Sequence, residues 1–176
     1  YQKSPEHKFP IPFDDCYAAL EWTVANAQVL NIDATKIGVG GDSAGGNLAS
    51  GVALAARDRG DISLAYQLLI YPCNGPEYVL DANVPNADGY GLTQRGMLWL
   101  WEQYLNGDAD RSHPYAVPHS ASSYADLAPA VIITAEFDVL REDGLAYAKK
   151  LKEAGNYVVH RDYAGMIHGF FNYGKY

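Results

Sequence analysis

The segment KIGVGGDSAGGNLAS, residues 36–50, places five glycines on the two sides of Ser43. The residues before it, "KIGVGG", form a short apolar run of the kind found in buried strands. The residues after it, "NLASGVALAARDRG", are rich in alanine and leucine and end in two arginines and a glycine, which is typical of a helix C-terminus. The segment therefore predicts a strand, a sharp turn and a helix, with Ser43 at the turn.

Strands and helices alternate along the rest of the chain. Runs rich in β-branched and aromatic residues predict further strands over residues 62–72, 129–138 and 157–165. Apolar residues at helical spacing predict further helices over residues 14–30, 97–105 and 141–155. Such alternation is typical of an α/β fold, with a mostly parallel sheet and helices on both faces.

The length and composition fit one domain. The chain has 176 residues, of which 48% are hydrophobic, and this is enough to build a core. We expect a single α/β domain over residues 1–176. Within it, residues 73–107 are rich first in Asn, Gly, Pro and Asp, and then regain helical character. We interpret them as an irregular excursion followed by a helix near a substrate pocket.

Charge and cysteine usage exclude several classes of partner. A formal net charge of −8 argues against nucleic acid or an anionic membrane surface, and no apolar run approaches the length of a membrane span. Cys16 and Cys73 lack the spacing of a metal or redox pair, which indicates reduced thiols and a cytoplasmic location. We expect no metal and no cofactor, because no cluster has metal-ligand spacing and the glycine run lacks the Lys-Ser/Thr pair of a phosphate-binding loop.

Three reactive side chains follow predicted strands, where the active sites of parallel sheets form. Ser43, Asp138 and His168 occur in the chain order Ser, Asp, His, which is the order of α/β-hydrolases. In that arrangement the histidine takes the serine proton, and the acid orients the imidazole. Taken alone, Asp138 is also compatible with a strand-end cap and His168 with an ordinary loop histidine.

The glycines around Ser43 fit the G-x-S-x-G pattern at Gly41 and Gly45. In this pattern the serine occupies a strained turn between strand and helix, and we expect side chains at the two glycine positions to clash with the crossing backbone. The helix N-terminus then directs backbone N–H groups toward an oxyanion.

A tryptophan-rich segment offers candidates for a substrate pocket. Leu98, Trp99 and Trp101, together with Ile167 beside His168, could form the wall of an acyl or alcohol pocket. Ordinary core packing explains the tryptophans equally well.

Four motifs together resemble the bacterial hormone-sensitive-lipase-like esterases (family IV) of the α/β-hydrolase fold. They are "YQKSPEHKFPIPFDDCYAALEW", "GDSAGGNLA", "TAEFDVLREDG" and "MIHGF", in this order along the chain. The resemblance implies a carboxylic-ester hydrolase that acts on short- to medium-chain acyl esters through an acyl-enzyme, without a cofactor. It implies Ser43 as nucleophile, Asp138 as acid and His168 as base, with the backbone N–H of Ala44 as an oxyanion donor.

Two features depart from the family pattern. The opening reads Tyr1-Gln2-Lys3-Ser4-Pro5-Glu6 where the family has Y-R-L-A-P-E, and the H-G-G-G motif that supplies further oxyanion donors is not among the 176 residues. The chain therefore resembles the C-terminal portion of such an enzyme, without the N-terminal strands and cap. The strand at residues 36–41 would then have a free hydrophobic edge, able to pair with that portion or with a second copy.

Other functions remain open at this level. A peptidase or a thioesterase uses the same chemistry on the same fold, because the fold does not determine the substrate. A hydrolase-like scaffold can also bind a small ligand without catalysis, or the chain could be a fragment with no independent role. The presence of His168 favours catalysis.

We predict that these 176 residues alone hydrolyse p-nitrophenyl butyrate more slowly than a form extended at its N-terminus through an H-G-G-G segment. The loss of an oxyanion donor typically lowers turnover by about 10²–10³. The measurement is kcat for both forms under the same conditions, and equal rates would contradict the prediction.

Overall fold

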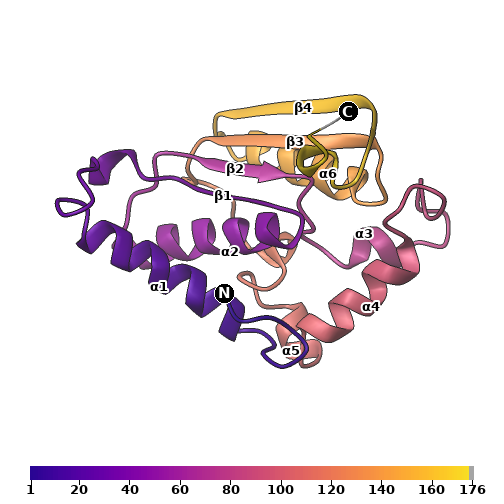
Figure 1. Cartoon of the computed structure of the whole chain (residues 1–176), viewed down its shortest axis with the longest axis horizontal. Helices are drawn as coiled ribbons and strands as arrows, with labels where there is room; N and C mark the ends of the chain where they lie inside the picture. The colour runs from indigo at the N-terminus through magenta and orange to yellow at the C-terminus, as the bar shows by residue number, and fades with distance from the viewer. Residues whose placement is uncertain (175–176) are drawn as a thin grey trace.

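The structure, a computed structural model, describes residues 1–174 and contains one parallel sheet (Figure 1). The strand order is β1-β2-β3-β4, and each neighbouring pair is parallel. The strands are β1 (Val39–Asp42), β2 (Gln67–Ile70), β3 (Ala130–Phe137) and β4 (Val158–Ile167). The predicted parallel α/β sheet is confirmed, although β1 and β2 are shorter than the runs that predict them.

Helices connect the strands and flank the sheet. The α-helices are α1 (Ile11–Ala25), α2 (Ala44–Arg59), α3 (Glu77–Leu80), α4 (Gln94–Tyr104), α5 (Asp108–Arg111) and α6 (Arg141–Glu153). Three short 3₁₀ helices are also found among residues 1–174: η1 (Ala34–Lys36), η2 (Pro118–Ser120) and η3 (Phe170–Asn172). α1 begins at Ile11 rather than at Asp14, because proline is favoured in the first helical turn and Pro12 occupies that position.

The long helices α2 and α6 pack on the same face of the sheet. Ala49 and Leu54 of α2 form one apolar cluster with side chains of β2, β3 and α6, and Leu54 is fully buried. Figure 1 shows α1 beyond α2, on the side away from the sheet. A second cluster joins α1 to α2 and to α4, through Phe13, Val52 and Trp101. Burial of these side chains is the main source of stability for the layered arrangement.

The opposite face of the sheet is less covered among residues 1–174. Its middle carries the half-buried side chains of Leu68, Val131 and Ile133. The short η3 lies over this face, and its Phe170 packs on Tyr163 with ring centroids 5.2 Å apart.

A register shift near the end of β4 matters for the site. β3 and β4 pair in regular register as far as Ala135 and Tyr163, but the next pair is Phe137 with Ile167, so β4 contains extra residues at this point. Gly165 lies within the irregular stretch with φ at 76°, and its N–H donates to Glu136 Oε2 at 2.7 Å. Only glycine adopts such a φ without strain.

None of the helices within residues 1–174 combines the length and apolar character needed to cross a membrane.

Candidate active site

Three side chains from distant parts of the chain form one series of hydrogen bonds. His168 Nε2 lies 2.9 Å from Ser43 Oγ, and His168 Nδ1 lies 2.7 Å from Asp138 Oδ2. The Asp138 side chain is fully buried and that of His168 is 13% exposed, whereas Ser43 is partly exposed. The arrangement therefore places a hydroxyl at the surface of the site and a carboxylate at its base, with the imidazole between them.

Strand register brings these residues together. Asp42 pairs with Ile70, so the chain leaves β1 directly before Ser43 at the same edge of the sheet where β2 ends. Phe137 pairs with Ile167, so Asp138 and His168 leave adjacent parallel strands at the same level. The register shift aligns Asp138 with His168, because the extra residues of β4 set the level at which His168 leaves that strand.

The backbone of Ser43 is strained. Its φ is 54° and its ψ is −117°, a conformation that costs a non-glycine residue about 1–3 kcal/mol. Hydrogen bonds hold this conformation from both sides: Ser43 N–H donates to Ile70 O at 2.9 Å, and Ser43 O accepts from Asn47 N–H at 3.1 Å. The turn between β1 and α2 therefore presents the hydroxyl at a corner, as expected for Ser43.

The two glycines of the turn have different roles. A Cβ on Gly41 would overlap the carbonyl carbon and oxygen of Gly45, so the backbone of α2 crosses the end of β1 with no room for a side chain. A Cβ on Gly45 would meet nothing within 4 Å. The expectation that both positions exclude side chains is therefore right for Gly41 and wrong for Gly45, because the Cβ of Gly45 points away from the crossing. Gly46 has less room for a side chain than Gly45, because a Cβ added to Gly46 would lie 3.0 Å from Pro72 Cβ.

Asp138 is held by the loop that leads into α6. Its Oδ1 accepts the Leu140 N–H at 2.9 Å, and its backbone carbonyl accepts the Arg141 N–H at 3.1 Å. Oδ2 is thus left for His168. These bonds fix the carboxylate so that it accepts the Nδ1 proton of the imidazole, which leaves Nε2 free to accept a proton from Ser43.

Tyr71 packs against the imidazole. The ring centroids of Tyr71 and His168 lie 4.6 Å apart, and Phe170 packs on Tyr71 at 5.8 Å. Tyr71 is 1% exposed, and burial together with the charge of Asp42 raises the pKa of its phenol to about 12. A neutral aromatic ring therefore packs against the imidazole of His168.

An apolar cavity of about 300 Å³ opens beside Ser43. Ser43, Ala44 and Asn47 line one side, and residues of α4 line the other. Burial raises the pKa of the Cys73 thiol at its wall, so this group stays uncharged. The α4 residues at the wall are Met97, Trp99, Leu100, Trp101, Gln103 and Tyr104.

The structure separates the four predicted pocket residues. Trp99 and Trp101 line the cavity, and Trp99 is 55% exposed. Leu98 is not among the lining residues but packs against the core cluster that joins α1, α2 and α4. Ile167 ends β4 directly before His168 and is likewise not at the cavity wall. The helical period of α4 explains the position of Leu98, because Leu98 and Glu102 lie one turn apart on the face of the helix that does not line the cavity.

Side chains missed by the sequence interpretation also hold the site. Asn47 donates from Nδ2 to Cys73 O at 2.9 Å and to Ala116 O at 3.0 Å, which ties α2 to two loops. Tyr71 supports the imidazole. Both are close in sequence to expected strand ends, but nothing in their spacing indicates the contacts they make.

Within residues 1–174, no group of three or more His, Cys, Asp or Glu side chains is placed to hold a metal ion.

Comparison with known proteins matches residues 1–172 to the family described as the alpha/beta hydrolase fold. The chain is 39% identical over 176 residues to carboxylesterase NlhH of Mycobacterium tuberculosis, covering 98% of this chain and 55% of that protein. It is 35% identical over 177 residues to ethyl acetate hydrolase of Pseudomonas putida, covering 99% of this chain and 55% of that protein. The chain thus spans about half the length of the curated relatives it matches.

Solved structures agree with these relatives. A hyperthermophilic esterase from the archaeon Pyrobaculum calidifontis superimposes with a TM-score of 0.90 at 43% identity, covering 98% of this chain and 56% of that one. A fungal esterase from Rhizomucor miehei superimposes with a TM-score of 0.91 at 43% identity, covering 98% and 55%.

We predict that Gly41→Ala destabilises the protein by about 3 kcal/mol or more, because its Cβ meets backbone that cannot move aside without opening the turn. Urea unfolding followed by circular dichroism measures the change in the free energy of unfolding.

Gly45→Ala is the matched control. Its Cβ points into open space within a helix, so we expect the free energy of unfolding to stay within about 1 kcal/mol of the parent or to rise. Equal destabilisation by the two changes would show that the crossing does not depend on Gly41.

Proposed function

Because the chain belongs to the α/β-hydrolase family, in its hormone-sensitive-lipase-like branch, we propose that the protein is a serine carboxylesterase. Its substrates would be short- to medium-chain acyl esters, and the reaction would pass through an acyl-enzyme. The observation that carries the proposal is the series of hydrogen bonds from Ser43 through His168 to Asp138, with distances of 2.9 and 2.7 Å.

In the first half of the proposed reaction, Ser43 Oγ attacks the acyl carbonyl carbon while His168 Nε2 accepts the hydroxyl proton. Asp138 stabilises the imidazolium that results. The tetrahedral intermediate then collapses, the bond to the alcohol oxygen breaks, and His168 returns the proton to the departing alcohol. An acyl ester on Ser43 remains.

In the second half, a water molecule replaces the alcohol. His168 accepts a proton from this water as the oxygen attacks the acyl carbon. Collapse of the second tetrahedral intermediate breaks the bond to Ser43 Oγ, which regains its proton from His168, and the carboxylic acid leaves. No cofactor takes part in either half.

The N-terminus of α2 supports the oxyanion. α2 begins at Ala44, and the first N–H groups of a helix lack partners within it. These groups and the helix dipole favour negative charge directly beside Ser43. We assign one oxyanion donor to the backbone N–H of Ala44.

The cavity is consistent with a small acyl group. Its volume of about 300 Å³ and its lining of Trp99, Trp101 and Met97 suit a short apolar chain better than a charged or peptide substrate. One relative, the Pseudomonas putida protein, is named for ethyl acetate, a short ester. The proposed partner is therefore a small-molecule ester.

Ser43→Ala tests the proposal. We expect a fluorophosphonate probe to label the parent protein at Ser43, and we expect Ser43→Ala to abolish both labelling and hydrolysis of p-nitrophenyl butyrate. Mass spectrometry of the labelled peptide identifies the modified residue. A folded parent protein that remains unlabelled would instead favour a non-catalytic binder.

Asp138→Asn tests the role of the acid. An amide at this position can donate to the imidazole instead of accepting from it, so the wrong tautomer of His168 is stabilised, and we expect kcat to fall by about 10⁴. The fold serves as the control, because the shape of the side chain is unchanged and circular dichroism should match that of the parent. An unchanged kcat would rule out Asp138 as the acid.

A matched series of butyryl compounds separates an esterase from a peptidase or a thioesterase. With the same acyl group on an ester, an amide and a thioester, we expect the highest kcat/KM for the ester.

A further inference from the structure

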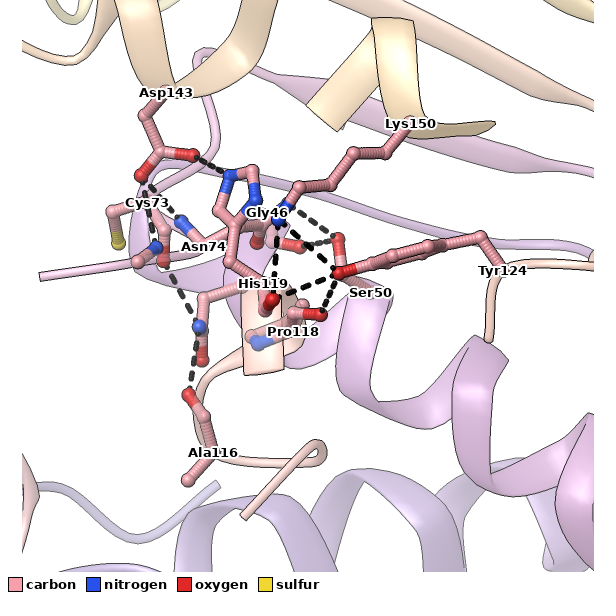
Figure 2. Close-up of polar contacts among 12 residues, drawn as sticks. Gly46, Ser50, Cys73, Asn74, Ala116, Pro118, His119, Tyr124, Asp143 and Lys150 are labelled. Atoms are coloured by element: carbon pink, nitrogen blue, oxygen red, sulfur yellow. Dashed lines mark hydrogen bonds and ion pairs between the residues drawn. The ribbon is translucent and has the colours of Figure 1, made fainter. Parts of the chain in front are cut away.

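A second buried carboxylate lies five residues after Asp138. Asp143, in the first turn of α6, is 0% exposed, and its partners all lie outside its own helix (Figure 2). Oδ2 accepts the backbone N–H groups of Asn74 at 2.8 Å and of Gly75 at 3.0 Å, and Oδ1 lies 2.9 Å from His119 Nε2. The proposed mechanism does not use any of these groups.

Resting on the proposed esterase function, we propose that Asp143 is a positioning residue, which holds the loop after β2 and the start of α6 in the alignment that keeps Asp138 in reach of His168. It touches neither substrate nor the reacting atoms. It acts through two rigid connections, one to α2, which begins directly after Ser43, and one to the turn that carries Asp138.

The first connection leads from Asp143 to α2. The loop residue Asn74 donates from Nδ2 to Ser50 Oγ at 3.1 Å, and Ser50 Oγ donates to Gly46 O at 2.9 Å, in the helical turn behind Ser43. Asn47 Nδ2 donates to Cys73 O of the same loop at 2.9 Å. The loop is therefore held between α2 on one side and Asp143 on the other.

The second connection is covalent and short. Asp138 and Asp143 belong to one loop-and-helix segment, in which Arg141 N–H donates to Asp138 O at 3.1 Å and Gly144 N–H donates to Leu140 O at 3.1 Å. A shift of the first turn of α6 would therefore move the Asp138 carboxylate. A displacement of about 1 Å in such a site can lower the rate about 100-fold.

The helix also holds η2 at a second point. Lys150, two turns further along α6, donates to His119 O at 3.2 Å, and Tyr124 OH donates to the same carbonyl at 2.9 Å (Figure 2). α6 thus forms hydrogen bonds with both the side chain and the backbone carbonyl of His119. These two contacts fix the rotation of α6 about its axis, which a single contact would not do.

Stability alone does not explain the polar cluster formed by Asp143, His119 and Asn74. Burial raises the pKa of Asp143 although His119 and two N–H groups favour its charge, so keeping it ionised carries a desolvation cost. Within residues 1–174, His119 Nδ1 and Asn74 Oδ1 are buried without a hydrogen-bond partner. Apolar side chains would fill this space at lower cost, whereas directional bonds set positions.

Asp143→Asn is the direct test. The amide keeps the shape and avoids burying a charge, so we expect the variant to fold, but it weakens the bonds to the loop and reverses the polarity toward His119. We expect fluorophosphonate labelling of Ser43 to slow by about tenfold or more, and kcat for p-nitrophenyl butyrate to fall by a similar factor with KM within about twofold. The low-field proton resonance of the His168–Asp138 hydrogen bond should shift or broaden.

Tyr17→Phe is the matched control for stability. It removes the bond from Tyr17 OH to Asp61 Oδ1, 2.7 Å long, at the opposite end of α2. We expect a comparable change in the melting temperature without slower labelling. Equal slowing in both variants would reduce the role of Asp143 to stability and overturn the inference.

The remaining outcomes are also decisive. Labelling of Asp143→Asn at the parent rate would overturn the inference and leave the esterase proposal intact, whereas an unlabelled parent protein would overturn both. If Asp143→Asn does not fold, Ser50→Ala carries the test, because alanine suits the helix while the bond to Asn74 is lost. If Ser50→Ala is labelled about threefold more slowly than the parent protein, the inference is supported. If it is labelled at the same rate as the parent protein, the inference is overturned.

Discussion

The crossing of β1 and the first turn of α2 is the constraint on which the site depends. The backbone at Gly41 and the carbonyl of Gly45 lie so close that no side chain fits between them, and Ser43 is held at φ 54° between the two elements. The strain is maintained because the backbone N–H and carbonyl of Ser43 are both bonded, to β2 and to α2. A hydroxyl at such a corner lies at the end of the sheet, beside a helix N-terminus. Any looser connection would allow the side chain to turn toward the core or into solvent.

The segment from Asp138 to Asp143 contains two buried carboxylates with different surroundings. Asp138 has one oxygen on a backbone N–H and the other on His168. Asp143 has backbone N–H groups on one oxygen and His119 on the other, and it does not line the cavity. The same chemical group thus aligns a reacting imidazole at one position and, in our proposal, aligns the scaffold at the other. Both uses rely on the low dielectric of the interior, which makes each unmade bond costly and each made bond directional.

Much of the architecture could be predicted from the sequence, because it depends on local patterns. The alternation of apolar strands with amphipathic helices indicates a parallel sheet, and the glycines around Ser43 indicate its turn. The positions of Asp138 and His168 after strands indicate where these side chains lie, because the C-terminal ends of parallel strands meet at one edge. Chain order alone predicts that the three side chains meet, but it gives no distances. The pairing of the strands places them within hydrogen-bond distance.

Tertiary structure alone decided the features that depend on contacts between distant segments. The freedom of Gly45, the packing of Tyr71 on His168 and the displacement of Leu98 from the cavity wall follow from which way a side chain points after the helices dock. The pairing of His119 with Asp143 joins residues 24 positions apart, in the short 3₁₀ helix η2 and in α6, and no periodicity links them. Sequence periodicity reports the environment of a residue along its own strand or helix. The partner across an interface is set by register, rotation and loop path, and these are fixed only when all the layers pack together.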